Sequence, residues 1–308
     1  MSGASAAAAA VQLVGGLALA PLLPGLVQHW KARLQGRRGP SPLQPYRELA
    51  RLWSRSSIDV EGTTLVYRLA PPVAAAALVA AVLLVPAAAD APELGVGHSL
   101  LALGGLLALA RFTVCAAAWD TENGFALMGA SRDLTISVFT EAALVLSLSV
   151  GALVAGTTDL TGVIAGTAGS DAWTSPGLAL GAVGFALVVL AETGRQPIDN
   201  PDTHLELTMI HEGPVLEYGG RDLALLQWTA SARHWVVLVL AAQVFVPHAK
   251  DVWLQLAILP LVLVVLCGAL ALVETLLAKM RILLAPRLLG IGAAAALLGV
   301  LSWLIETG

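Results

Sequence analysis

The chain has 308 residues, of which 57% are hydrophobic and 12% are charged, and its formal net charge at pH 7 is -4. Soluble domains carry about 25% charged residues, so this chain has roughly half the charge needed to cover a water-facing surface. A soluble enzyme is therefore excluded, as are disordered and fibrous chains. The 17 Lys and Arg residues are too few and too dispersed to form a nucleic-acid-binding surface.

Eight continuous apolar runs are near or above the length that a helix needs to cross a bilayer. The runs lack the alternation of a membrane β-barrel. We therefore predict an all-α integral membrane protein, a single polytopic domain over 1–308 with about eight transmembrane helices. The sixth run is short and needs extension back through Trp228 to cross. The expected spans are 5–27, 69–89, 99–118, 134–157, 176–192, 234–247, 253–274 and 286–305.

Basic residues predict the orientation of these spans. No Lys or Arg precedes Lys31, so we expect the first run to remain as a span rather than to be a cleaved signal peptide. If both termini lie outside, 15 of the 17 Lys and Arg residues fall in inner segments. Because Lys and Arg concentrate in cytoplasmic loops, we predict a multi-pass protein with both termini outside.

Two long inner loops, 28–68 and 192–233, emerge on the same side and form a candidate docking surface. In the first loop an apolar face alternates with basic residues, which predicts an amphipathic helix lying in the headgroup plane. The alternative is that the basic residues only hold the loop inside. The apolar face consists of Tyr46, Leu49, Leu52 and Trp53.

Four ionisable residues lie within or at the end of predicted spans, where each costs about 2.5 to 3.5 kcal/mol at the bilayer centre. Arg111 and Glu141 are at similar depth on consecutive spans, about 10 Å from the inner interface at ~1.5 Å per residue. Glu192 and Glu274 end the fifth and seventh spans, where the alternative is that they only reach toward the interface. We predict that the three glutamates are proton-relay groups with Arg111 as their counter-charge.

Histidines and cysteines do not predict a metal or haem site. Neither Cys115 nor Cys267 has a CxxC partner, and no histidine lies at mid-depth in a span. The segment HLELTMIHE (204–212) differs from the zinc-binding HExxH helix in order and spacing. We therefore expect no catalytic residue, metal or other cofactor in this chain.

The run ETGRQPIDNPDTHLELTMIHEGPVLEYGG (192–220) is the most informative stretch. Pro197 and Pro201 prevent a continuous helix. The acids are interleaved with apolar residues, which favours a partly buried loop over a merely solvated one. These acids are Glu192, Asp199, Asp202, Glu206, Glu212 and Glu217.

At these residues the chain resembles the family that joins subunit 1 of respiratory NADH dehydrogenase (complex I) with subunit 4 of formate hydrogenlyase and related membrane-bound nickel-iron hydrogenases. The matching positions are Glu192, Arg195, Pro197, Asp199, Glu206, Glu217 and Tyr218. LMGASRDLTISVFTE (127–141) is similar to a second family segment, with Arg132 and Glu141 in its Arg and Glu positions. KARLQGRRGPSPLQPYRELARL (31–52) is similar to the first inner loop, whose core is Arg37, Arg38, Gly39 and Pro40.

The resemblance implies a non-catalytic membrane subunit of an oxidoreductase complex in the plasma membrane of a bacterium or archaeon. Such a subunit anchors peripheral hydrogenase and iron-sulfur subunits beside antiporter-like membrane subunits, and it links electron transfer to proton movement. Iron-sulfur clusters and the nickel-iron centre belong to these partners. The sequence around Asn200 and Thr203 is similar to the hydrogenase branch, which favours a formate-hydrogenlyase-like complex.

The resemblance also implies an inner cavity and docking loop. Its residues are Arg37, Arg38, Arg132, Arg195, Asp199, Asp202, Glu206, Glu212, Glu217 and Tyr218. Three alternatives remain open: a quinone-site subunit of complex I, with quinone as ligand; a stand-alone ion transporter that uses the same carboxylates; and a purely structural anchor.

Overall fold

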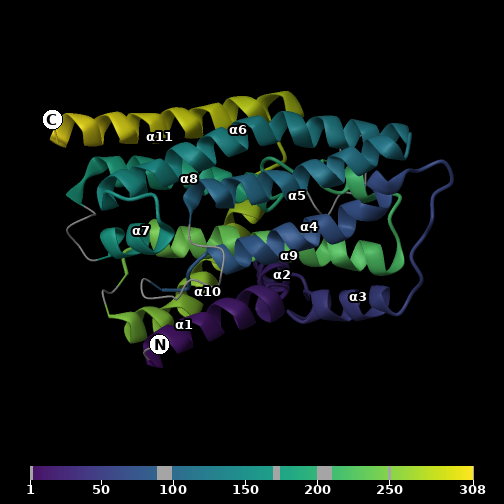
Figure 1. The fold of residues 1–308 in the computed structure, drawn as a ribbon, viewed down its shortest axis with the longest axis horizontal. Helices are drawn as coiled ribbons and strands as arrows, with labels where there is room; N and C mark the ends of the chain where they lie inside the picture. The colour runs from purple at the N-terminus through teal and green to yellow at the C-terminus, as the bar shows by residue number, and fades with distance from the viewer. Residues whose placement is uncertain (1–2, 89–98, 169–173, 200–209, 249–250, 308) are drawn as a thin grey trace.

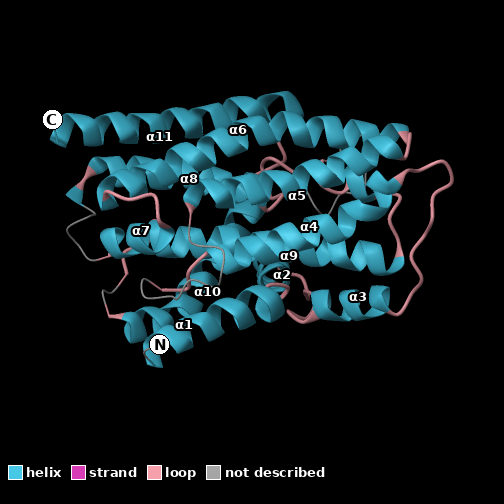
Figure 2. Ribbon diagram, viewed as in Figure 1, coloured by secondary structure: helices cyan, strands magenta, loops and turns pink. Residues whose placement is uncertain are grey.

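The computed structural model describes residues 3–88, 99–168, 174–199, 210–248 and 251–307. Within these ranges every regular element is a helix, which confirms the predicted all-α fold. Figure 2 shows the helices and the loops that join them, including a long loop over residues 54–64. The elements are α1 (Gly3–Leu13), the π-helix η1 (Val14–Leu19), α2 (Leu22–Leu34), α3 (Gln44–Trp53), α4 (Leu65–Leu84), α5 (Leu100–Asp120), α6 (Gly124–Ala155), α7 (Leu160–Thr167), α8 (Pro176–Glu192), the 3-10 helix η4 (Gly213–Val215), α9 (Gly220–Val244), α10 (Val252–Leu276), the 3-10 helix η5 (Ile282–Leu284) and α11 (Ala285–Thr307).

Among the described residues, six helices are long and apolar enough to cross a membrane: α4, α5, α6, α9, α10 and α11. The pair formed by the first helices and α2 is bent by 60° and counts as a seventh span if the two parts cross together. Helix α8 has only 17 residues. The predicted number of eight spans therefore requires that both the bent pair and α8 cross.

Helix α9 differs most from its predicted span. It begins at Gly220 instead of residue 234, so it includes Trp228, as the length of a crossing helix requires. The connection after α8 consequently ends at 219, and the second half of the predicted loop 192–233 is helical. This places Arg233 inside the helix bundle instead of at its surface.

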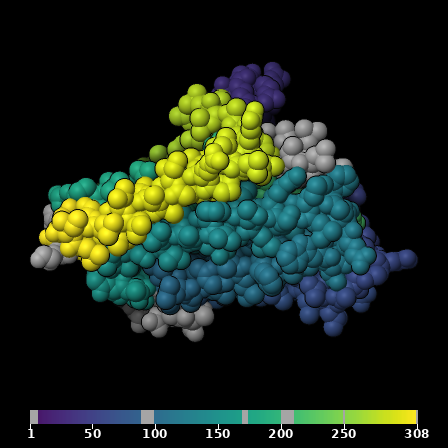
Figure 3. Space-filling view, turned by 90° about the horizontal axis from the view of Figure 1, so that it is seen from above, coloured from purple at the N-terminus to yellow at the C-terminus, as the bar shows by residue number. Residues whose placement is uncertain are grey.

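The long helices run side by side, and both termini lie at one end of the bundle, with α3 at the other (Figure 1). Helix α11 packs against α6 and α8 and covers them in the space-filling view (Figure 3). That both termini lie on the outer side of the membrane stays a prediction.

Helix α3 is amphipathic, as predicted, and packs against α9. Leu52 is buried, whereas Trp53 is 55% exposed and therefore does not belong to the buried face. The Tyr46 hydroxyl donates to the Ala18 carbonyl at 2.6 Å, and the indole N–H of Trp228 donates to the Leu17 carbonyl at 3.1 Å. Because Pro21 has no N–H to offer, these two aromatic residues satisfy carbonyls at the bend before α2.

The segment before α9 is fixed to the helix bundle by close backbone contact and by two tyrosines. A Cβ atom on Gly129 would lie only 2.7 Å from the Gly213 Cα, so α6 and η4 touch through glycine. The rings of Tyr67 and Tyr218 stack with centroids 4.3 Å apart, and the Tyr218 hydroxyl donates to the Tyr67 carbonyl at 2.7 Å. These contacts fix the position of this segment relative to α4 and α6.

Substitution of Gly129 by Val tests this contact. The added methyl groups would overlap the η4 backbone and should lower the free energy of unfolding by about 1 to 3 kcal/mol. The measurement is the thermal midpoint of the detergent-solubilised chain. Gly105→Val on α5 is the control, because a Cβ there meets nothing within 4 Å. Equal midpoints for both variants would contradict the contact.

Candidate functional site

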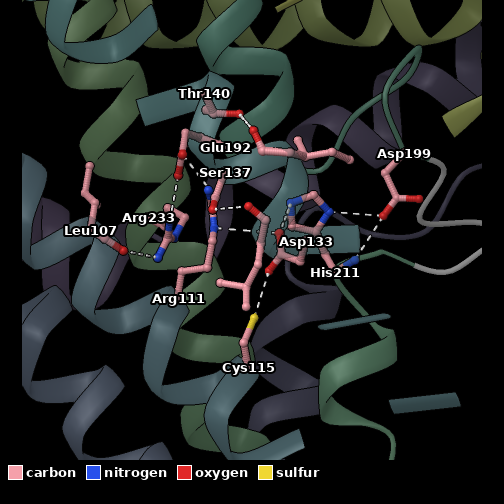
Figure 4. Close-up of polar contacts among 12 residues, drawn as sticks. Leu107, Arg111, Cys115, Asp133, Ser137, Thr140, Glu192, Asp199, His211 and Arg233 are labelled. Atoms are coloured by element: carbon pink, nitrogen blue, oxygen red, sulfur yellow. Dashed lines mark hydrogen bonds and ion pairs between the residues drawn. The ribbon is translucent and has the colours of Figure 1, made fainter. Parts of the chain in front are cut away.

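A carboxylate held between two guanidinium groups lies at the centre of the candidate site (Figure 4). Glu192, at the end of α8, accepts from Arg111 of α5 at 2.9 Å and from Arg233 of α9 at 2.6 Å. Arg233 also donates to the Leu107 carbonyl at 2.9 Å. All three charged side chains are buried. Such a set is tolerated in the interior because each charge has an opposite charge and hydrogen bonds.

A second carboxylate, Asp133 of α6, approaches the same arginine. Its Oδ1 lies 3.7 Å from Nε of Arg111, and the Cys115 thiol donates to its Oδ2 at 3.7 Å. Arg111 therefore stands between the carboxylates of α6 and α8. Two buried cations and two buried anions balance each other within this cluster.

The loop after α8 continues the cluster through a histidine. Nδ1 of His211 lies 3.1 Å from Oδ2 of Asp199, and its Nε2 lies 3.8 Å from Oδ1 of Asp133. Lys279, between α10 and α11, binds the other Asp199 oxygen at 3.0 Å. Burial raises the pKa of Asp199, but the hydrogen bond from His211 and the contact with Lys279 outweigh it and hold that pKa well below its usual range.

Glu274, at the end of α10, belongs to a separate buried cluster. Arg195 approaches one of its oxygens at 3.2 Å, and Lys31 of α2 approaches the other at 3.3 Å. Arg195 and Asp199 are four residues apart in the same loop, so this loop connects both clusters. Its fixed position is supported by the Met280 N–H, which donates to the Pro197 carbonyl at 2.9 Å.

A cavity of about 570 Å³ opens beside the central cluster. Its wall combines apolar side chains from α5, η4 and α9 with charged ones. The charged residues that line it are Arg111, Asp133, Glu192, Asp199, His211, Glu212 and Arg233. Tyr218 lines it as well. The volume is within the range of pockets that hold small molecules or several waters.

Glu141 stands apart from these ion pairs. It lies two turns after Asp133 on α6 and is half-buried. Among the described residues no hydrogen bond or ion pair reaches its carboxylate, although Arg111 acts on it electrostatically. Arg111 forms its ion pairs with Glu192 and Asp133 instead.

Three of the four predicted relay residues lie in two separate clusters, and Glu141 lies in neither. Arg111 is the counter-charge of Glu192, as expected, but Glu274 has its own cations in Lys31 and Arg195. The single polar cluster expected from depth alone is thus two clusters, because α8 and α10 present their final glutamates to different neighbours. The loop after α8 joins them.

The predicted cavity and docking residues also separate. Asp199, Glu212 and Tyr218 line the cavity, whereas Arg195 lies in the Glu274 cluster. Glu217 accepts from the Asn123 amide at the junction of α5 and α6. Arg37 and Arg38 are exposed and Arg132 is half-buried, none of them at the cavity wall. Asp202 and Glu206 lie outside the described residues.

Three residues of the site are absent from the sequence-based prediction: Asp133, His211 and Arg233. Asp133 precedes Glu141 by eight residues on one helix, a spacing that places both on the same side of α6. Arg233 was assigned to the loop because the sixth span was expected to begin at residue 234. His211 has no comparable signal, since its contacts depend on how the loop folds back.

The described part of the chain contains no group of three or more His, Cys, Asp or Glu side chains arranged to hold a metal ion. The groups present are arginines, carboxylates and one imidazole. These groups can hold and exchange protons, and they can bind a polar group in the cavity.

Replacement of Arg111 by Met tests the energetic importance of the central cluster. It removes the cation that stands between Asp133 and Glu192 and should lower the free energy of unfolding by about 3 to 5 kcal/mol. Arg68→Met is the matched control, because Arg68 and its partner Asp59 are 63% and 84% exposed. The loss there should be about 0 to 1 kcal/mol. Thermal midpoints in detergent compare the two variants, and similar losses would contradict a stabilising role of the buried cluster.

The chain is similar in sequence to several known proteins. The chain is 35% identical to hydrogenase-4 component C of Escherichia coli strain K12, over 94% of this chain and 92% of that protein. It is 33% identical to formate hydrogenlyase subunit 4 of the same strain, over 93% of this chain and 95% of that protein. NADH-quinone oxidoreductase subunit 8 of Rhodothermus marinus is 25% identical over 66% of this chain and 60% of that protein.

A solved structure shares the fold. A chain of the membrane-bound sulfane sulfur reductase, an archaeal respiratory membrane complex, superposes with a TM-score of 0.78 at 19% identity, covering 94% of this chain and 98% of that chain. The family model described as NADH dehydrogenase matches residues 7–304. The chain therefore belongs to the NADH dehydrogenase family.

Proposed function

We propose that this chain is the membrane anchor and ion-coupling subunit of a formate-hydrogenlyase-like or related hydrogenase complex, and that it links electron transfer in peripheral subunits to proton movement. The two Escherichia coli relatives named above support the hydrogenase branch, since each aligns over nearly the whole chain. The conversion chemistry would belong to the partners, which would carry iron-sulfur clusters and a nickel-iron centre.

The observation that carries the coupling proposal is the buried cluster around Arg111 at the cavity wall. Arg111 lies 2.9 Å from Glu192 and 3.7 Å from Asp133. A small movement of its side chain would therefore change which of the two carboxylates it binds more strongly. An ion pair that shifts between two carboxylates changes which of them can accept a proton. An event in the cavity can thus be converted into a proton movement inside the bundle.

Glu141 is the carboxylate best placed to take up and release that proton. The arginines and carboxylates of the central cluster already balance in charge, so an ionised Glu141 adds a negative charge without a paired cation at membrane depth. Such a charge is costly, and protonation removes it. Glu192 and Glu274 are each held by two cations, and they are then the further relay positions. Movement of Arg111 or Arg195 would decide whether each of these glutamates carries a proton.

The end of the bundle that carries α3 and the loop after α8 is the proposed docking side. Arg37 and Arg38 are exposed there, and Glu217 and Tyr218 fix the loop to the helices. Peripheral hydrogenase and iron-sulfur subunits would bind this end, which would face the cytoplasm, and antiporter-like membrane subunits would pack beside the helices. The membrane would be a bacterial or archaeal plasma membrane, with both termini outside.

A second candidate function is a quinone-binding subunit, as in NADH-quinone oxidoreductase. The cavity of about 570 Å³, with apolar walls and a few converging polar groups, favours this candidate. Quinone-dependent activity that is lost with quinone-site inhibitors would support it over the hydrogenase assignment.

Purification of the chain in mild detergent, followed by identification of its companions by mass spectrometry, tests the assignment. A nickel-iron hydrogenase large subunit among the companions supports the proposal, and NADH-oxidising subunits support the second candidate. Ion flux from the purified chain alone in liposomes would favour a stand-alone transporter over both.

Glu141→Gln tests the coupling role. The variant keeps the shape of the side chain but cannot exchange a proton, so it should abolish proton translocation by inverted membrane vesicles while the chain stays in the membrane. Glu306→Gln, at the exposed end of α11, is the control and should translocate normally. Full activity and unchanged translocation in Glu141→Gln would refute the relay.

A further inference from the structure

Two buried polar atoms near the cavity face each other without a hydrogen bond. Nε2 of His211 and Oδ1 of Asp133 are both inaccessible to solvent, and neither finds a hydrogen-bonding partner within the described part of the chain. They lie 3.8 Å apart (Figure 4). An unsatisfied buried polar group costs about 1 to 3 kcal/mol, and an approach of under 1 Å would turn this contact into a hydrogen bond.

The other side of the imidazole ring is firmly held. Nδ1 of His211 lies 3.1 Å from Oδ2 of Asp199, and the backbone N–H of His211 donates to the same oxygen at 3.2 Å. Lys279 fixes the second Asp199 oxygen. The ring therefore stands between a carboxylate of the loop and a carboxylate of α6, with one nitrogen toward each.

We propose that His211 carries protons from Asp199 in the loop after α8 to Asp133 in α6, and so connects the loop to the Arg111 cluster. This inference rests on the proposed ion-coupling function. In one transfer an O–H bond on Asp199 breaks as an N–H bond forms at Nδ1, and the N–H bond at Nε2 breaks as an O–H bond forms on Asp133. No electron moves. His211 lines the cavity, where water would take the proton from Nδ1 and return one to Nε2, which restores the starting tautomer.

The charges around His211 favour uptake of a proton by the ring from Asp199. Burial lowers the pKa of the ring, but Asp133 and Asp199 outweigh burial and the opposing effect of Arg111, so the pKa of His211 is raised. Glu192, from α8, also faces the ring electrostatically. Because the pKa of Asp199 is held low, a proton that arrives at this carboxylate moves on to the ring.

Chemical rescue tests the transfer in the intact complex. His211→Ala should reduce proton translocation by inverted vesicles about tenfold or more while electron transfer continues. Added imidazole should restore it, because the cavity beside residue 211 admits so small a molecule. Imidazoles of lower pKa should shift the pH profile of the rescued variant downward, which a merely structural histidine would not do. His248→Gln, at the opposite end of the bundle, is the control.

The rescue experiment has clear opposing outcomes. Undiminished translocation in His211→Ala, failure of every imidazole to restore it, or full recovery in His211→Lys would each overturn the inference. If Glu141→Gln also translocates normally, the coupling function itself fails. If Glu141→Gln blocks translocation and His211→Ala does not, only the role of His211 fails.

A second measurement is independent of any partner. In the full chain in lipid nanodiscs, NMR of labelled histidine follows the titration of His211. Asp199→Asn and Asp133→Asn each remove a negative charge that stabilises the imidazolium, so each should lower the pKa of His211, and protonation should be lost at lower pH. Asp159→Asn, at the start of α7, is the control. An unchanged titration in both test variants would exclude the coupling.

Discussion

The placement of Glu192 between Arg111 and Arg233 is the interaction on which this part of the bundle depends. Three charged side chains, from α5, α8 and α9, are buried together. Burial of each one costs free energy unless the other two stay in place. Three helices are thereby held at one relative height. The same three side chains line the cavity beside them.

The loop after α8 makes this fixed cluster responsive. It is attached to α10 through Arg195 and through the backbone of Pro197, to α6 through Gly213, and to α4 through the stacked ring of Tyr218. A partner that displaces the loop would therefore change distances in both buried clusters.

Hydropathy and charge distribution predicted the helical class, the approximate spans and the amphipathic α3, because these depend on local patterns. Residue depth predicted that Arg111 and Glu192 lie in the inner half of the bundle. The depth of a residue along its helix does not predict which charged residue it pairs with. The packing of the helices decides the partners: α8 meets α6 and α9, whereas α10 meets α2 and α9, so Glu192 and Glu274 find different partners.

By itself the sequence determined that the chain is a helical membrane protein, that it resembles one family, and that a few charges persist where hydrocarbon penalises them. Tertiary structure alone decided that Asp133, His211 and Arg233 join the site. Asp133 and Arg233 were hidden by uncertain helix rotation and a late helix start, and His211 by the course of an irregular loop. The physical reason is the same in each case: pairing of buried charges acts between elements distant in sequence, and no local pattern records it.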